Sequence, residues 1–322
     1  MSPPAREFAA SRELSRLLTM FAGAERPLHP DRPAPAAALV LLREAAAGVE
    51  VFVTRQSDAR GNAERNRWAF PTTELIASDL RRLRTAGWSA EQCAAALRID
   101  SPSRALALYT AAARIGLVTM GILLAEDIDG RVVTTAGIPV ERSTRELVAA
   151  KRLSFPQVLD DRDLRFRPDL LRPWLRWINT PWQLRRFDTV YFTAALPHVQ
   201  HVDFLSHNDA WGGWKAPAEV LAASDPDRSE HISVATRLVC ESLAEMPSIG
   251  SAMTRIRDLR PIIPEIAQRG DRWWVTVSPP ADPSQRGALR DSGTVESGED
   301  DADSPPLVAE TEEESEIDPR AE

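Results

Sequence analysis

The feature that most constrains the fold is an unbroken apolar run from Ala36 to Leu42. A strand with one face in water alternates apolar and polar residues, so a strand that is apolar at every position is expected to be covered on both faces. Residues Val49 to Thr54 alternate instead, and Gly48 lies in the short connection between the two segments, which predicts a β-hairpin. The sheet that contains this hairpin therefore needs other structure packed on each side.

Strands and helices interleave along the rest of the body, which favours an α/β architecture with a mixed sheet. A long apolar helix is expected to begin at Ser101-Pro102, where serine is a favourable N-cap. The other predicted strands are Thr189 to Leu196, Gln200 to Leu205 and Arg272 to Val277, and the other predicted helices lie within residues 1–26, within 74–100, from Pro217 onward and over Ser233 to Ala244.

Composition divides the chain into three parts. Residues 1–32 hold a short helix and a proline-rich linker, residues 33–278 form the folded domain, and residues 279–322 are rich in serine, proline, glycine and acid. The last part cannot bury enough apolar surface to order itself, so we expect a disordered acidic tail. Residues 291–322 hold 13 acidic residues against Arg320, a net charge of about -12, so residues 1–290 carry about +4 of the total of -8 and give no strong signal for nucleic acid.

Several features indicate a cytoplasmic protein. Cys93 and Cys240 share no metal-ligand spacing and make no disulfide framework, which suits a reducing compartment. The N-terminus lacks the basic region and apolar run of a secretion signal. Ala105 to Ala125 is apolar for about the length of a membrane span, but Arg114 at its centre favours a buried helix. Only two of the 39 basic residues are lysine, which indicates a GC-rich, bacterial genome.

Seven short blocks occur in an order that is more specific than any block alone. They are Pro33 to Arg43, Val49 to Arg55, Trp68 to Pro71, Leu153 to Phe155, Leu171 to Ile178, Arg185 to Thr189 and Gly213 to Val220. In this order they resemble the Nudix hydrolase superfamily, in the branch that includes bacterial relatives of the coenzyme A diphosphatases. The resemblance implies a Nudix-like α/β/α sandwich with a mixed sheet, in which residues 72–102 form a helical insert before the catalytic helix.

The chemistry of that family depends on one helical box, whose last nine positions run Arg-Glu-apolar-x-Glu-Glu-x-Gly-apolar. Setting Gly121 on the box glycine keeps the arginine and the final apolar residue but replaces all three glutamates. The residues of this vestigial Nudix box are Arg114, Ile115, Val118, Thr119, Gly121 and Ile122.

Loss of the three glutamates predicts loss of the metal site. Cleavage of a diphosphate by Mg²⁺ or Mn²⁺ requires oxygen ligands for the metal. Ile115 and Val118 offer no oxygen, and Thr119 offers one neutral hydroxyl. We therefore expect no cofactor and no catalytic residue. The favoured interpretation is a non-catalytic module that binds a nucleotide-like or coenzyme-like small molecule or a protein partner, with no membrane and no specific nucleic acid.

The alternative is a divergent Mg- or Mn-dependent hydrolase of nucleoside-diphosphate-linked or coenzyme A-like diphosphates, with ligands from elsewhere in the chain. Arg145-Glu146-Leu147 resembles the start of the box, but Lys151 and Arg152 follow where acids are required, which indicates an ordinary solvated helix. Glu126 and Asp127 lie beyond Gly121 and are expected to cap the end of the helix.

Two other clusters are candidate binding sites. Arg185, Arg186 and Asp188 lie in a stretch of arginines and tryptophans that could hold an anionic ligand, although buried tryptophans and arginine–aspartate pairs would explain the same composition. His198, His201 and Asp203 could bind Zn²⁺, although their spacing matches no established zinc signature and polar surface residues are the favoured interpretation.

Overall fold

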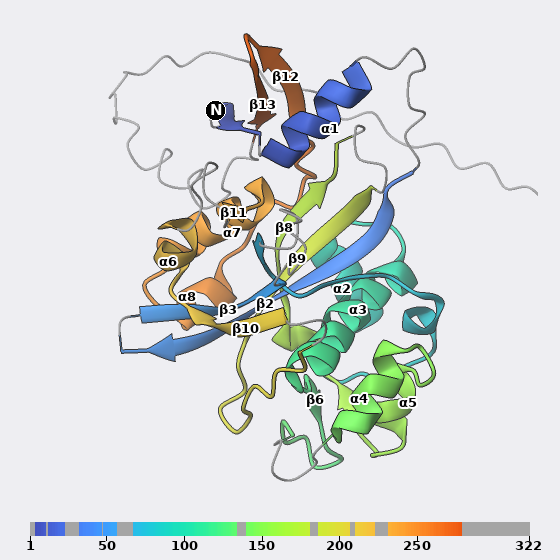
Figure 1. Cartoon of the computed structure of the whole chain (residues 1–322). Helices are drawn as coiled ribbons and strands as arrows, with labels where there is room; N and C mark the ends of the chain where they lie inside the picture. Colours follow the sequence, from blue (N-terminus) through green and yellow to red (C-terminus); the bar gives the residue numbers. More distant parts are fainter. Residues whose placement is uncertain are drawn as a thin grey trace, which may run out of the picture.

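The structure of the chain is a computed structural model. It describes residues 4–10, 12–22, 32–46, 48–56, 67–133, 140–180, 186–206, 210–222 and 231–278. Its centre is a mixed β-sheet with helices packed on both faces (Figure 1). The predicted α/β sandwich with a mixed sheet is therefore confirmed.

The sheet is organised around β2 (Ala34–Ala45), which pairs with several neighbours. It forms the predicted hairpin with β3 (Gly48–Gln56) and a second antiparallel pairing with β5 (Thr72–Glu74). β9 (Phe187–Ala195) runs parallel to β2 over nine residue pairs, and this parallel pairing makes the sheet mixed. The remaining strands of this sheet are β4 (Arg67–Ala69), β8 (Arg172–Ile178), β10 (Ala210–Lys215) and β11 (His231–Ile232).

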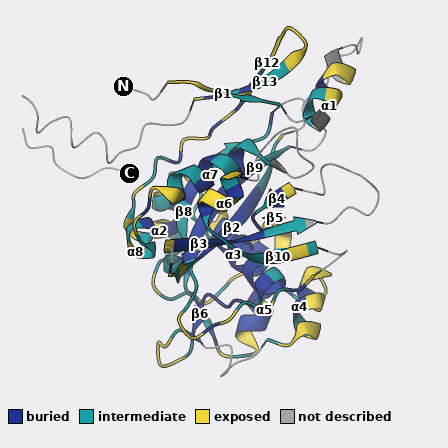
Figure 2. Cartoon of the chain, turned by 60° about the vertical axis from the view of Figure 1, so that its left-hand side comes forward, coloured by how far each residue is buried: buried dark blue, intermediate teal, exposed yellow. Residues whose placement is uncertain are grey.

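Alternate side chains of β2 enter two separate hydrophobic cores. The odd-numbered residues from 37 to 41 pack with α2 (Ala90–Leu97) and α3 (Pro102–Met120), whereas the even-numbered residues from 38 to 42 pack with α7 (Val234–Ala244). Every residue from 37 to 42 has an exposure of 0%, and Figure 2 shows β2 as a buried strand within the molecule. The unbroken apolar run is thus covered on both faces, as predicted.

The long apolar segment forms α3, which is buried along most of its length. Its N-cap is Ser101, as predicted, and the Ser101 side chain accepts a hydrogen bond from the backbone N–H of Arg104. The helix ends at Gly121, whose φ of 71° lies in the left-handed region that favours glycine. Gly116 allows close packing on the sheet, because a Cβ there would lie 2.8 Å from Cδ2 of Leu39. No helix in the described ranges is long and apolar enough to cross a membrane.

The region before α3 contains short elements rather than one helix. After β5 come η2 (Ala77–Leu80) and α2, and the connection from α2 leads directly into α3. The chain between α3 and β9 contains six further short elements. These are β6 (Ala125–Glu126), α4 (Arg142–Ala149), α5 (Phe155–Asp160), β7 (Arg165–Phe166), η3 (Pro168–Leu170) and β8.

The two ends of the described chain meet in a second, smaller sheet. β1 (Arg6–Ala9), which the sequence did not indicate, pairs with β13 (Arg272–Val277), and β13 pairs in turn with β12 (Glu265–Arg269). α1 (Arg12–Ala22) lies beside this sheet (Figure 1) and confirms a helix within residues 1–26. The linker residues 23–31 and the expected acidic tail, residues 279–322, lie outside the described residues.

Three of the remaining predictions concern the segment between β9 and β13. The helices expected from Pro217 and over Ser233 to Ala244 are α6 (Pro217–Ala222) and α7, and α8 (Ile249–Thr254) follows them. The strand predicted over Gln200 to Leu205 is wrong, because residues 200–206 form no strand. Instead, the backbone N–H groups of Asp203 and Leu205 donate hydrogen bonds to carbonyl groups at the end of α3.

Both cysteines are free and fully buried, one in each hydrophobic core. Burial raises the pKa of the Cys93 thiol and of the Cys240 thiol to about 12. Since only the thiolate is a good nucleophile, both residues should be inert in the folded protein. We expect iodoacetamide at about pH 8 to alkylate neither cysteine in the native protein and both in concentrated guanidinium chloride, as measured by intact mass. Rapid labelling of the native protein would contradict this burial.

Candidate functional site

The residues of the vestigial box lie on the second half of α3 and just after it. Ile115 packs partly buried against the first core, and Val118 and Ile122 are buried in it. Thr119 is half-buried. The positions that would carry glutamates therefore present apolar side chains and one hydroxyl to a packed surface.

Arg114 is buried and fully occupied by partners from the segment before α3. Its Nε and Nη2 donate to the two carboxylate oxygens of Asp79 at 2.7 and 2.9 Å. The same guanidinium also donates to the Thr73 hydroxyl at 3.1 Å and to the carbonyl oxygen of Glu74 at 2.9 Å. The Asp79 side chain has an exposure of 0%. Arg114 therefore fastens residues 73–79 to α3, and four of its five N–H groups are used in doing so.

The end of α3 is closed by backbone and side-chain donors. The last four carbonyl groups of a helix have no partner within the helix and must find one elsewhere. The Leu117 carbonyl accepts from Gly121 N–H at 2.9 Å. The Thr119 and Met120 carbonyls accept from the N–H groups of Leu205 and Asp203, both at 2.9 Å. Residues 203–205 therefore run against the helix terminus, which explains why the strand predicted there does not form.

The remaining terminal carbonyl, that of Val118, binds the guanidinium of Arg145. Arg145 Nε and Nη2 donate to this oxygen at 3.3 and 3.1 Å, and Nη1 and Nη2 donate to Asp203 Oδ2 and Asp203 O, both at 2.7 Å. Burial lowers the pKa of Arg145, and the Asp203 carboxylate partly offsets this. An arginine stays charged in a protein, and a cation is favourable at a helix C-terminus.

Arg145 corrects the prediction that residues 145–147 form part of an ordinary solvated helix. The segment is indeed helical, within α4, but the exposure of Arg145 is only 1%. Nothing in the local sequence distinguishes Arg145 from the exposed Arg142 on the same helix. Its two partners are 27 and 58 positions away in the chain, so only the folded structure identifies its role.

The two acids that follow α3, Glu126 and Asp127, also have partners within the protein. Glu126 does not cap the helix as expected, because it lies in β6, where it is buried and forms ion pairs with Arg165 at 2.7 Å and Arg167 at 2.8 Å. Asp127 accepts from two backbone N–H groups of the turn that follows and likewise does not cap α3. Each acid therefore has a local structural partner.

The carboxylates and imidazoles of the described residues do not gather into a metal site. No three His, Cys, Asp or Glu side chains in these ranges lie close enough together to hold a metal ion. His198 and His201 are exposed, and Asp203 pairs with Arg145. His207 and Asp209 lie outside the described residues. The donor set that the structure describes therefore does not fit Mg²⁺ or Mn²⁺ beside the box.

The arginine- and tryptophan-rich stretch is largely structural. Trp174 fills the second core with an exposure of 1%. Arg176 Nε and Nη2 donate to the two oxygens of Asp188 at 2.8 and 2.6 Å. Arg186 Nε donates to the Asn179 carbonyl at 3.2 Å, and Arg185 lies outside the described residues. Of the predicted ligand-binding residues, Asp188 alone is known to line a cavity.

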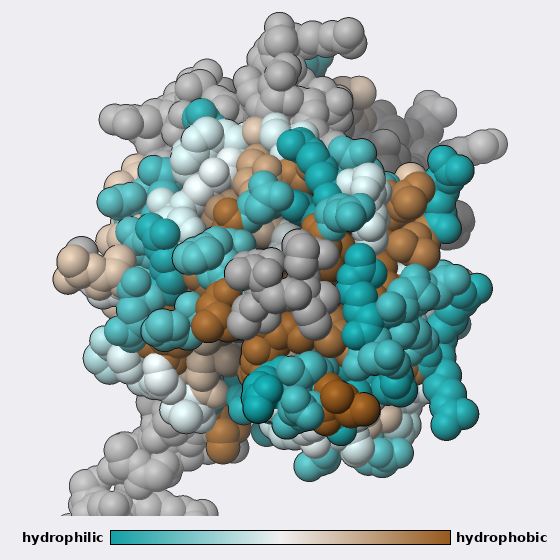
Figure 3. Space-filling view, turned by 90° about the horizontal axis from the view of Figure 1, so that it is seen from below, coloured by the Kyte–Doolittle hydropathy of each residue, from teal (hydrophilic) through white to brown (hydrophobic). Residues whose placement is uncertain are grey.

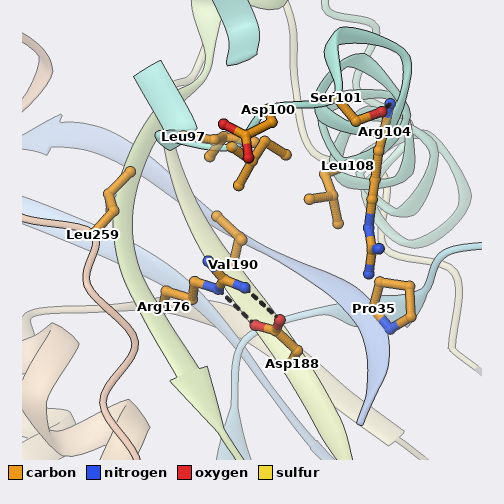
Figure 4. Close-up of a pocket in the computed structure, with 11 residues that line it drawn as sticks. Pro35, Leu97, Asp100, Ser101, Arg104, Leu108, Arg176, Asp188, Val190 and Leu259 are labelled. Atoms are coloured by element: carbon orange, nitrogen blue, oxygen red, sulfur yellow. Dashed lines mark hydrogen bonds and ion pairs between the residues drawn. The ribbon is translucent and has the colours of Figure 1, made fainter. Parts of the chain in front are cut away.

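That cavity has a volume of about 260 Å³ and lies at the opposite end of α3 from the box (Figure 4). It is bounded by the starts of β2 and β9, the end of β8, the connection from α2 to α3 and a segment before β12. Its lining residues are Pro35, Leu97, Ile99, Asp100, Ser101, Arg104, Leu108, Arg176, Asp188, Val190 and Leu259. Sequence reasoning singled out Asp188 and missed the rest, because they come from five separate segments.

Comparison with known proteins identifies the fold. No protein-family profile matches the sequence, and no curated protein matches it. The crystal structure of a NUDIX hydrolase from Alicyclobacillus acidocaldarius superimposes with a TM-score of 0.57 at 21% identity, covering 70% of this chain and 97% of that chain. The chain has a Nudix-like fold. A C. elegans Ap4A hydrolase also matches, with a TM-score of 0.33 at 11% identity, covering 66% of this chain and 95% of that chain.

Within this Nudix-like fold, the buried pair of Arg114 and Asp79 is expected to be essential for stability. In the Asp79→Ala variant a buried guanidinium loses its counter-ion, which typically costs about 3–5 kcal/mol. Urea unfolding monitored by tryptophan fluorescence measures this loss. The matched control is Asp129→Ala, because Asp129 is 62% exposed in its pair with Arg131 and should contribute nothing measurable. Equal stabilities of the two variants would refute the assignment.

A second expectation concerns the closure of the α3 terminus in this fold. The Arg145→Met variant keeps the apolar stem but leaves the Val118 carbonyl without its donor, which should reduce stability by about 1–3 kcal/mol. Amide hydrogen exchange of Asp203 and Leu205 should accelerate, since both amides bind the same helix end. Arg142→Met is the control on the same helix, because the Arg142 side chain is 61% exposed. Unchanged exchange in Arg145→Met would show that the closure does not depend on this residue.

Proposed function

We propose that the protein is a non-catalytic module with a Nudix-like fold and a degenerate Nudix box, related to the coenzyme A diphosphatase branch. It binds a nucleotide-like or coenzyme-like small molecule or a protein partner and does not hydrolyse a diphosphate. One observation carries this proposal. Ile115, Val118 and Thr119 occupy the three glutamate positions, and the helix end beside them is closed by Arg145 and residues 203–205.

The chemistry of the site supports the absence of hydrolysis. Side chains at i, i+3 and i+4 lie on one face of a helix, so three carboxylates there could converge on a cation, whereas isoleucine and valine have no oxygen. Two acids that contact residues on or beside the box helix, Asp79 and Asp203, are already bound to Arg114 and Arg145. Moving Asp79 to a metal would leave Arg114 buried without a counter-ion, which is strongly unfavourable.

A protein partner is supported by exposed apolar side chains at the lower end of the molecule in Figure 1. Ile128, just after β6, is 81% exposed, and Leu147 on α4 is 39% exposed. Figure 3 shows this face from below, with hydrophobic patches between hydrophilic residues. Exposed apolar patches on a soluble surface often mark contacts with other proteins.

The second candidate function is a divergent Mg- or Mn-dependent hydrolase of nucleoside-diphosphate-linked or coenzyme A-like diphosphates. The likeness of the fold to the NUDIX hydrolase of Alicyclobacillus acidocaldarius favours it. It requires oxygen ligands other than the three box positions, and the carboxylates described near α3 are committed to arginines.

Metal titration and an activity panel separate the two candidates. We expect calorimetric titration with Mg²⁺ and Mn²⁺ to give no saturable heat, because the box offers no carboxylate. We also expect no metal-dependent cleavage of coenzyme A, ADP-ribose, NADH or dinucleoside polyphosphates, with an active Nudix hydrolase assayed in parallel. The Asp203→Asn variant is the informative companion, since Asp203 is 75% exposed and its loss should not unfold the protein. Metal-dependent turnover that disappears in this variant would establish the hydrolase instead.

A further inference from the structure

The cavity at the N-terminal end of α3 is separate from the vestigial box. Arg104 lines the cavity and Val118 belongs to the box, and both lie on the same helix. Fourteen residues at about 1.5 Å per residue place them roughly 21 Å apart along the helix axis. A ligand in the cavity therefore does not touch the box, and binding there is independent of whether the box holds a metal.

Part of the cavity wall is apolar. Leu97, Leu108, Val190 and Leu259 are buried residues that line it, and Figure 4 shows them around one space. An apolar cavity of about 150 Å³ stays dry and accepts a benzene ring. The volume of about 260 Å³ therefore has room for two fused rings or for one ring with a short chain. Burial of that apolar surface supplies the main driving force for binding.

The cavity wall is held in place from two sides. Arg98 is the C-cap of α2 with a φ of 54°, and this left-handed residue turns the chain into Ile99 and the start of α3. The Arg98 guanidinium lies 3.6 Å from the Asp258 carboxylate, directly before the lining residue Leu259. The insert and the C-terminal segment are thus joined at the edge of the cavity, which is consistent with a largely preformed site.

The charged residues of the cavity differ in whether they have a partner of opposite charge. Arg176 and Asp188 neutralise one another through two hydrogen bonds. Arg104 is exposed, and its guanidinium forms no hydrogen bond or ion pair with any residue of the described chain. Figure 4 shows its side chain running from α3 along the cavity toward Pro35. Within the described ranges, Arg104 is therefore a cation of this site without a bound partner.

The position of Arg104 in the helix favours an anionic ligand. Arg104 is the third residue of α3, and the N-terminus of a helix carries positive charge that disfavours a cation and favours an anion. Asp100, one residue before the N-cap, is by contrast stabilised by the same helix end. A monoanion could pair with Arg104, whereas the second charge of a dianion would have no cation and would be repelled by the carboxylate of Asp100.

We propose that this cavity binds a small apolar monocarboxylate of one or two rings, with the rings among the apolar lining residues and the carboxylate on Arg104. The ligand class follows from the volume, the apolar part of the wall, and Arg104, which has no partner among the residues that the structure describes. This binding activity is additional to the proposed loss of hydrolysis. It does not depend on whether the box residues support hydrolysis.

The test compares three probes of one shape and different charge. They are 2-naphthoate, 2-naphthalenemethanol and 2-naphthylmethylammonium, titrated into the full chain and followed by methyl NMR. We expect 2-naphthoate to shift the methyl signals of Leu97, Leu108, Val190 and Leu259. We also expect it to bind about fivefold more tightly than the neutral alcohol, as one partly exposed ion pair allows, and more tightly than the ammonium probe.

Two variants test whether Arg104 causes the preference for the carboxylate probe. Arg104→Ala should reduce the affinity for 2-naphthoate to that for the alcohol and leave the affinity for the alcohol unchanged. Arg82→Ala is the matched control, because Arg82 is also exposed but does not line the cavity. The proposal is overturned if no lining methyl shifts, if the ammonium probe binds best, or if the preference for the carboxylate survives in Arg104→Ala.

Discussion

The buried guanidinium of Arg114 is the interaction on which the arrangement around α3 depends. An unpaired charge in the interior is strongly unfavourable, so this side chain needs acceptors from outside its own helix. It finds them in Asp79, the Thr73 hydroxyl and the Glu74 carbonyl, and thereby fixes residues 73–79 against α3. Because β5 also pairs with β2, the same bonds link the long helix to the central strand. The packing of α3 on the sheet and the conformation of the chain that precedes it are therefore coupled.

At the C-terminal end of α3, Arg145 and residues 203–205 donate hydrogen bonds to the terminal carbonyl groups of the helix. Arg114 and Arg145 thus bind the carboxylates of Asp79 and Asp203, respectively, and both ion pairs have structural roles. The N-terminal half of α3 has a different environment, in which Arg104 faces a cavity and has no described partner. Among the described residues, α3 therefore has one end whose carbonyl groups are all hydrogen-bonded and another end where Arg104 has no partner.

The sequence predicted those features whose causes are local. The apolar run of β2, the hairpin with β3 and the N-cap at Ser101 depend on neighbouring residues, and all three were predicted correctly. The errors arose where a distant partner decides the outcome. Residues 200–205 alternate like a strand, but two of their N–H groups bind the end of α3. Glu126 was expected to cap that helix, but two arginines some forty positions later hold it in β6. The cavity could not be predicted, because its walls come from segments that meet only in the folded chain.

The difference between Arg145 and a divalent cation supports the proposed lack of catalysis. Both place positive charge near oxygen atoms, but they act on them differently. A guanidinium donates hydrogen bonds in a fixed plane and has no vacant coordination position, so it cannot bind a water molecule and lower its pKa. The donors of Arg145 are moreover used on the Val118 carbonyl and on Asp203. Arg145 can therefore stabilise the end of α3 as a cation should, while it provides neither an activated nucleophile nor a site for phosphate oxygens. The C-terminal end of α3 is thus stabilised by Arg145, which cannot itself promote cleavage of a diphosphate in the way a bound metal ion does.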